Sequence, residues 1–135
     1  MISLNKNKLN EAGQAALRIG FSIAMIIVHG IGKLEMVVNG EFGFPDPLGI
    51  GAIASVYLIM LAEFICPIFT LVGFKTRYFS IPIIGALLVA LLIFHASDPF
   101  ADRELAFVYS IAFIVIGLNG SDRYSLDAWL ANRKS

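Results

Sequence analysis

The sequence predicts an all-α polytopic membrane protein, an antiparallel bundle of four transmembrane helices. Its composition is 58% hydrophobic and only 15% charged, so too few charges remain to cover a water-soluble surface. Four apolar stretches approach the roughly 20 residues that a helix needs to cross a bilayer core, and none shows the alternation of a membrane β-strand. At 135 residues, the chain is expected to form one domain, residues 1–135.

The expected spans cover residues 12–31, 48–72, 78–95 and 105–118. The first follows two lysines in the manner of a signal peptide. Arg18 interrupts it, however, and no small-x-small cleavage site follows it, so we interpret it as an uncleaved span. The fourth is the shortest and depends on Glu104 and Asn119 at its ends.

The tail, residues 124–134, is expected to form a short helix in the membrane interface. Ser125 is a suitable N-cap, Asp127 falls in the first turn, and Trp129 suits the headgroup layer.

Basic residues are distributed unequally between the two sides of the predicted bundle. One side carries Lys6, Lys8, Lys75, Arg77, Arg123, Arg133 and Lys134. The other side carries only Lys33 and Arg103. Because loops rich in lysine and arginine stay in the cytoplasm, both termini are predicted to be cytoplasmic.

The first span carries polar residues along one helical face. Arg18, Ser22, Met25, His29 and Lys33 follow one another at intervals of three or four residues. Residues so spaced lie on one side of a helix. Because charges are costly in lipid, this face is predicted to point into the bundle.

Arg18 and Glu63 are predicted to form an intramembrane ion pair. Arg18 lies 15 residues before Lys33, and Glu63 lies 15 residues after Leu48. Both would therefore lie about 22 Å below the outer boundary. The pair would either fix the helix register or take part in function, and the sequence leaves both roles open.

A polar pocket is predicted near the outer side, formed by His29, Lys33, His95 and Glu104. Its two imidazoles change charge between about pH 5 and 8, so they could transfer protons, and Lys33 could stabilise negative charge. Two alternatives are less favoured: haem ligation by the two histidines, and a metal held by the histidines with Glu104. No metal site is predicted, because no single helix supplies an i, i+3 or i, i+4 ligand pair.

Composition also excludes several classes of function. The net charge is zero, which argues against a nucleic-acid partner because no basic stripe could neutralise phosphates. Cys66 is the single cysteine, so no internal disulfide and no CxxC motif can form. The role of this cysteine is not evident from the sequence.

Six separated motifs resemble the DoxX family of small bacterial membrane proteins. They are Leu17-Arg18-Ile19 with His29-Gly30-x-x-Lys33, Pro45-Asp46-Pro47-Leu48-Gly49, Ala62-Glu63, Gly73-Phe74-x-Thr76-Arg77, His95-x-x-Asp98-Pro99-Phe100 with Glu104-Leu105-Ala106, and Arg123-Tyr124-Ser125-Leu126-Asp127. The resemblance implies a compact four-helix bundle in the inner membrane. Relatives include a subunit of an archaeal thiosulfate:quinone oxidoreductase and a component of a mycobacterial oxidative-stress complex.

Three functions follow as hypotheses. The first is a membrane subunit of a quinone-linked redox or oxidative-stress system, acting with a redox partner protein. The second is a non-catalytic membrane scaffold, and the third is a carrier for a small polar or amphiphilic compound. Small residues along the spans also permit a homo-oligomer. No motif identifies a bound cofactor, and quinone is the favoured ligand.

Overall fold

The computed structural model describes residues 5–135, and all regular secondary structure in this range is helical. This confirms the predicted all-α class for the described residues. Within these described residues, three helices are long and apolar enough to cross a membrane: Lys6–Asn39, Ala52–Val72 and Thr76–Phe94. They correspond to the first three expected spans.

The helices form four rods, each a continuous or nearly continuous run of helix, and a short tail. The first rod joins α1 (Lys6–Met25), η1 (Ile26–Gly30) and α2 (Ile31–Asn39). The second joins α3 (Ala52–Met60), η2 (Leu61–Ile65) and α4 (Cys66–Val72), and the third joins α5 (Thr76–Val89) and η3 (Ala90–Phe94). The fourth rod is α6 (Phe100–Asn119), and the tail is α7 (Leu126–Arg133).

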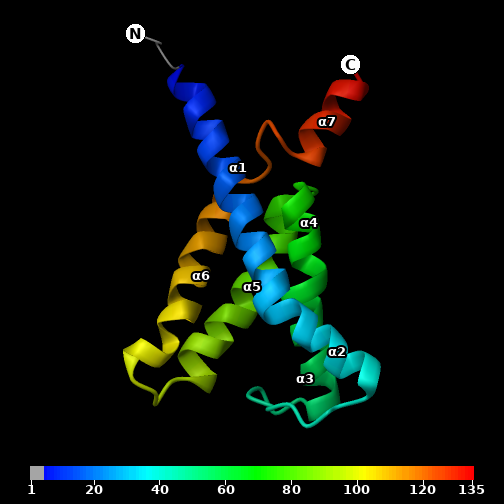
Figure 1. The fold of residues 1–135 in the computed structure, drawn as a ribbon, viewed down its shortest axis with the longest axis vertical. Coiled ribbons are helices and arrows are strands. Elements are labelled where there is room, and N and C mark those ends of the chain that lie inside the picture. Colours follow the sequence, from blue (N-terminus) through cyan, green and yellow to red (C-terminus); the bar gives the residue numbers. More distant parts are fainter. Residues whose placement is uncertain (1–4) are drawn as a thin grey trace.

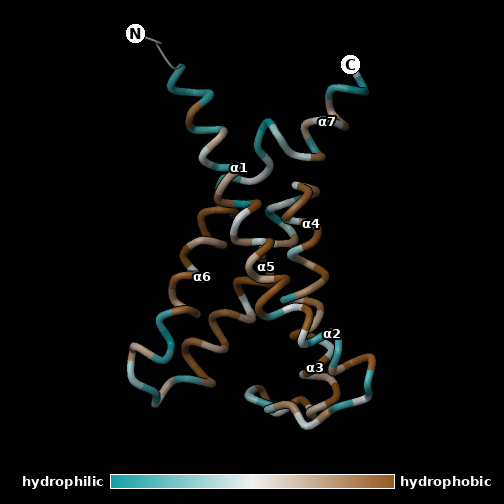
Figure 2. The backbone as a smooth tube through the Cα atoms, viewed as in Figure 1, coloured by the Kyte–Doolittle hydropathy of each residue, from teal (hydrophilic) through white to brown (hydrophobic). Residues whose placement is uncertain are grey.

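Both termini lie at one end of the molecule, here called the terminal end (Figure 1). The connections of residues 40–51 and 95–99 lie at the opposite end, here called the loop end. Apolar residues dominate the middle of the rods, and hydrophilic residues gather at the start of α1, in α7 and at the loop end (Figure 2). This banding is what a bilayer core between two aqueous layers requires.

The first two rods have boundaries that differ from the expected spans. The first extends to Asn39 and ends at Gly40, whose φ of 70° is the left-handed conformation that terminates helices. The second begins at Ala52, because Gly49 and Gly51 have φ values of 69° and 101° that a helix cannot contain. The polar ends of the first rod remain helical, so its length exceeds that of its apolar stretch.

The fourth expected span corresponds to α6, which packs against α5 and α1. Asp102, Arg103 and Glu104 follow one another near its start. Its apolar part is therefore confined to about residues 105–118.

The buried core draws side chains from all four rods. Its members are Met25, Cys66, Ile83, Leu87, Tyr109, Phe113 and Ile116. Many large apolar side chains lie outside it, and Ile27, Ile81 and Leu118 are 62%, 65% and 72% exposed. A surface of this kind is unfavourable in water and ordinary in lipid.

The backbones of the first two rods lie in close contact at Gly30. A Cβ atom at this position would lie 2.3 Å from the backbone oxygen of Glu63. The π-helical turns η1 and η2 meet at this point. Only a glycine permits this contact, and turns of this kind often accompany functional sites.

Candidate functional site

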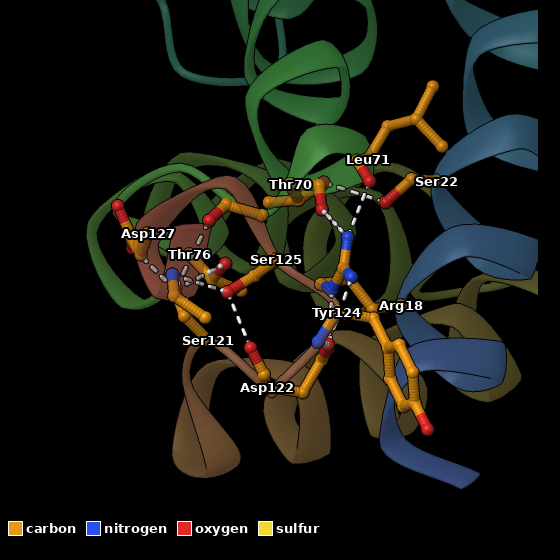
Figure 3. Close-up of polar contacts among 12 residues, drawn as sticks. Arg18, Ser22, Thr70, Leu71, Thr76, Ser121, Asp122, Tyr124, Ser125 and Asp127 are labelled. Carbon is orange, nitrogen blue, oxygen red and sulfur yellow. Dashed lines mark hydrogen bonds and ion pairs between the residues drawn. The ribbon is translucent and has the colours of Figure 1, made fainter. Parts of the chain in front are cut away.

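Arg18 is fully buried at the terminal end and is paired with Asp122 (Figure 3). Its Nε and Nη2 donate to the two carboxylate oxygens of Asp122 at 2.6 and 3.2 Å. Its Nη1 donates to the backbone oxygens of Thr70 and Leu71, at 3.1 and 2.5 Å. These carbonyls belong to the last turn of α4, where intrahelical donors run out, and that of Thr70 also accepts from the Gly73 N–H at 3.1 Å. The guanidinium thus caps α4 and neutralises Asp122 at once.

The predicted Arg18–Glu63 ion pair is therefore wrong. The prediction placed the outer ends of both helices at the edges of their apolar stretches. In the structure Arg18 lies 21 residues before Asn39, and Glu63 lies 11 residues after Ala52. At 1.5 Å per residue this offsets the two charges by about 15 Å along the helices. The reasoning correctly placed both groups inside the bundle, but it gave them the wrong partners.

A loop after α6 completes the network around Arg18. The Asp122 carboxylate also accepts from the backbone N–H of Tyr124 at 2.9 Å, and the Ser125 hydroxyl donates to the Asp122 backbone oxygen. Ser125 then caps α7 by accepting from the Ala128 N–H at 3.2 Å, which confirms the predicted N-cap. The loop and the start of α7 are thereby held against the bundle.

The same network reaches the connection between α4 and α5. The Asp127 carboxylate accepts from the Lys75 N–H at 2.8 Å and from the Ser121 hydroxyl at 2.5 Å. Gly73, with φ of 75°, turns the chain here, and a Cβ on it would lie 2.4 Å from that of Ser125. Three of the sequence motifs, around positions 18, 73–77 and 123–127, therefore meet in one polar cluster. Its contacts are internal, which indicates a structural role.

A second polar cluster surrounds a cavity of about 300 Å³ toward the loop end, here called the chamber. Ionisable or hydroxyl-bearing side chains from the first, second and fourth rods and from the connection after η3 line it: His29, Lys33, Glu63, His95, Asp102 and Tyr109. The remaining lining is mostly apolar. A cavity of this size with a few polar groups is typical of a small-molecule site.

Lys33 and Glu63 lie next to each other in the lining of the chamber. Lys33 Nζ lies 3.7 Å from Glu63 Oε2, and the side chains are 21% and 13% exposed. This separation exceeds hydrogen-bonding distance, and Oε2 of Glu63 is buried without a hydrogen-bond partner among the described residues. Lys33 also lies over the Phe44 ring at 5.3 Å. A charged oxygen next to a cavity is thus left with unused hydrogen-bonding capacity.

The two histidines occupy different parts of the chamber. His29 lies edge-on to the ring of Tyr109, with centroids 5.6 Å apart and planes at 83°. His95 is half-exposed, and its Nδ1 lies 2.6 Å from Oδ2 of Asp98. His29, Lys33 and His95 all lie in the lining of this one cavity.

Glu104 does not belong to this group, although the sequence placed it there. Its side chain is exposed and is absent from the chamber lining. The helix begins at Phe100, so Asp102, Ala106 and Tyr109 share the face that lines the chamber. Position 104 falls on another face, and Asp102 takes the place expected for Glu104.

The connection between α2 and α3 covers the loop end and is organised by Asp46. Its carboxylate accepts from the N–H groups of Gly51 and Ile50 at 2.8 and 3.0 Å, and from the Ser55 hydroxyl at 2.9 Å. These bonds, the Gly51 N–H first and the Ser55 hydroxyl next, hold the pKa of Asp46 below its ordinary value. They also fix the nearby Phe44, Pro45 and Pro47, which line the chamber.

Sequence reasoning missed several residues of these clusters. Asp122 lies outside the apolar stretches, so a search among intramembrane carboxylates could not find it. Tyr109 was hidden among other apolar residues of the fourth span, although its spacing of seven residues from Asp102 was a usable signal. Among residues 5–135, no three His, Cys, Asp or Glu side chains are grouped closely enough to hold a metal ion.

Comparison with known proteins gives one match. The profile of the family described as DoxX matches residues 13–96, which include both residues of the Lys33–Glu63 contact. No curated protein and no solved structure matches the chain.

Proposed function

The chain belongs to the DoxX family, and from that premise we propose that it is the membrane subunit of a quinone-linked redox system. The chamber would hold the quinone head group. A redox partner protein would supply the electrons, since no motif in this chain identifies an electron carrier. The chain would lie in the inner membrane with both termini cytoplasmic, and α6 would form the fourth span.

One observation supports this proposal most directly. Oε2 of Glu63, beside Lys33, is buried and has no hydrogen-bond partner among the described residues. A buried carboxylate oxygen without a hydrogen bond is costly, and the Lys33 ammonium 3.7 Å away offsets this only in part, because it makes no hydrogen bond to that oxygen. A ligand oxygen between the two groups would satisfy both. A quinone carbonyl accepts from the Lys33 ammonium, and a quinol hydroxyl donates to the Glu63 carboxylate. One ligand in its two redox states therefore fits both partners.

Reduction of the quinone to the quinol takes up two electrons and two protons. The redox partner supplies the electrons, and the chamber must deliver the protons. Asp98 fixes His95 near the loop end, and when Nδ1 donates to this carboxylate, Nε2 can accept a proton from outside. His29, packed on Tyr109 deeper in the chamber, is placed to pass a proton to a ligand oxygen.

Binding of a short-chain ubiquinone analogue to the purified protein tests this proposal. We expect saturable binding by the wild-type protein. Lys33→Met should weaken binding of the oxidised analogue about tenfold or more, and Glu63→Gln should do the same for its reduced, quinol form, because each removes a hydrogen bond between that form and a charged group. Glu104→Gln is the matched control: it removes a carboxylate at the same end of the molecule but outside the chamber, and should leave the affinity unchanged.

Two results would remove the proposal. One is the absence of saturable binding by the wild-type protein. The other is wild-type affinity in both chamber variants, provided that they elute as the wild-type protein does in size-exclusion chromatography. In that case a scaffold without a ligand would become the better hypothesis.

A further inference from the structure

A second cavity adjoins the chamber and lies between α3 and α5. We propose that this groove holds the hydrocarbon tail of the amphiphile whose head group occupies the chamber, and that the ligand reaches the chamber sideways from the bilayer. The inference rests on the proposed function and adds to it a ligand class: a quinone with a long apolar tail.

The groove has a volume of about 360 Å³ and an apolar lining. Leu58 and Ala62 line it from the second rod, and Pro82 and Gly85 line it from α5. Ser55 supplies the only polar side chain in the lining, and its hydroxyl already donates to Asp46 at 2.9 Å. No group in the groove is thus free to bind a polar head, whereas a hydrocarbon chain leaves nothing there unsatisfied.

The groove and the chamber lie directly beside each other. The residues that line both cavities are Phe44, Pro47, Ile59, Ala86 and Val89. Phe44 is also the ring beneath the Lys33 ammonium, so it separates the polar wall of one cavity from the apolar wall of the other. A ligand with its head near Lys33 therefore has an apolar groove immediately beside the head-group site for its tail.

The far side of the groove is open. Leu48, Ile50 and Leu58 at its margin are 53%, 46% and 52% exposed. Leu58 lies in the apolar helix Ala52–Val72, and Leu48 and Ile50 lie in the connection just before it, so we infer that the opening lies at the loop-end edge of the bilayer core, within reach of acyl chains. A tail could pass from lipid into the groove without crossing an aqueous layer.

Gly85 keeps the groove open. It lies within α5, and a Cβ atom added there would meet nothing within 4 Å. A glycine in the middle of a helix destabilises it by about 1 kcal/mol relative to alanine, and no close helix contact explains this one. Pro82, three residues earlier on the same face, also presents a short side chain to the groove. The empty space above Gly85 is what a bound tail would fill.

The test compares a tailless ubiquinone analogue with one carrying a decyl chain, using wild-type protein and Gly85→Leu. The leucine fills the groove without touching the chamber. We expect it to weaken binding of the tailed analogue about tenfold, as overpacking does, and to change binding of the tailless analogue less than twofold. Partitioning of an analogue into detergent micelles is the same for every protein variant. It therefore cancels in the ratio of the variant's affinity to the wild-type affinity for that analogue.

Gly20→Leu is the matched control. Gly20 is also an exposed helical glycine with open space around its Cβ position, but it lines neither cavity. It should leave both affinities unchanged. A photoreactive group at the end of the decyl chain supplies a second measurement on the wild-type protein, and we expect cross-links to Leu58 or to residues 82–86.

The outcomes separate the two proposals. If both analogues bind but Gly85→Leu affects them equally, and cross-links fall outside the groove, the chamber stands and the groove assignment is wrong. The groove would then hold only an ordinary membrane lipid. If neither analogue binds to the wild-type protein, the proposed function fails and the groove assignment fails with it.

Discussion

Arg18 ties three segments of the chain together at the terminal end. Its side chain is 2% exposed, and it bonds to the end of α4 and to the loop after α6. A cation at a helix C-terminus is favourable because it compensates the carbonyls that lack intrahelical donors. Once Arg18 is buried, Asp122 is the carboxylate that balances its charge.

Asp122→Asn is therefore expected to destabilise the protein by about 3 kcal/mol or more, because it leaves a buried guanidinium without a counter-charge. SDS-induced unfolding of the solubilised protein measures the loss. Glu41→Gln, at an exposed carboxylate, should have no effect. If Glu63→Gln destabilised the protein far more than Asp122→Asn, the observed pairing of Arg18 would be contradicted.

The sequence indicated that Arg18 must be paired, but it could not identify the partner. Burial of the charge followed from the apolar residues around it, which is a local property. Its partner depends on how far each helix continues beyond its apolar stretch, and capping by Gly40 and Gly51 decides this. The prediction that Glu104 lines the pocket was wrong for a similar reason, because the start of α6 at Phe100 sets which face of that helix points inward.

The contact between the first two rods depends on a single glycine. Gly30 in η1 lies against the backbone of Glu63 in η2, and the same two turns carry His29 and Glu63 into the chamber. The distance between the first two rods and the geometry of the chamber are therefore set at the same point.

Gly30→Ala is expected to destabilise the bundle by about 1–3 kcal/mol, because its methyl group would overlap backbone atoms that cannot move without separating the rods. Gly32→Ala is the matched control: a Cβ there meets nothing within 4 Å. It should stabilise the helix by about 0.5–1 kcal/mol. Thermal unfolding of the two variants should shift in opposite directions, and equal shifts would show that the close contact is not rigid.

The connection between α2 and α3 should confer acid sensitivity through Asp46. Its folded pKa lies below its unfolded value because the Gly51 N–H and the Ser55 hydroxyl bond to the charged carboxylate. The unfolded chain therefore binds a proton first on acidification. The stabilisation is complete above the ordinary aspartate pKa of about 3.9 and is lost as the pH falls through the lower folded value.

Asp46→Asn should consequently be less stable than the wild-type protein near neutral pH and should lose less stability on acidification. The measurement is the thermal midpoint of both proteins at about pH 7 and about pH 3. Glu41→Gln, in the same connection, is the control and should follow the wild-type curve. Parallel curves for Asp46→Asn and wild type would show that the carboxylate does not stabilise the loop.

The molecule as a whole separates its polar residues into two clusters at different depths. The Arg18 network closes the terminal end, and the chamber opens toward the loop end. Hydropathy predicted the rods well, because apolar length alone decides which segments can span. It could not predict the clusters, since each joins residues from distant parts of the chain, such as Arg18 with Asp122 and Lys33 with Glu63.

This separation makes the orientation of the protein testable. The positive-inside rule predicts a cytoplasmic terminal end, and on that prediction the chamber would lie near the outer side. In intact cells, a membrane-impermeant maleimide should label Gly43→Cys, at the loop end, and should leave Ser135→Cys unlabelled until the membrane is permeabilised. The wild-type protein is the control, because Cys66 is its only thiol and is buried. Labelling of Ser135→Cys in intact cells, with Gly43→Cys protected, would reverse the orientation and would place the proton supply of the chamber on the cytoplasmic side.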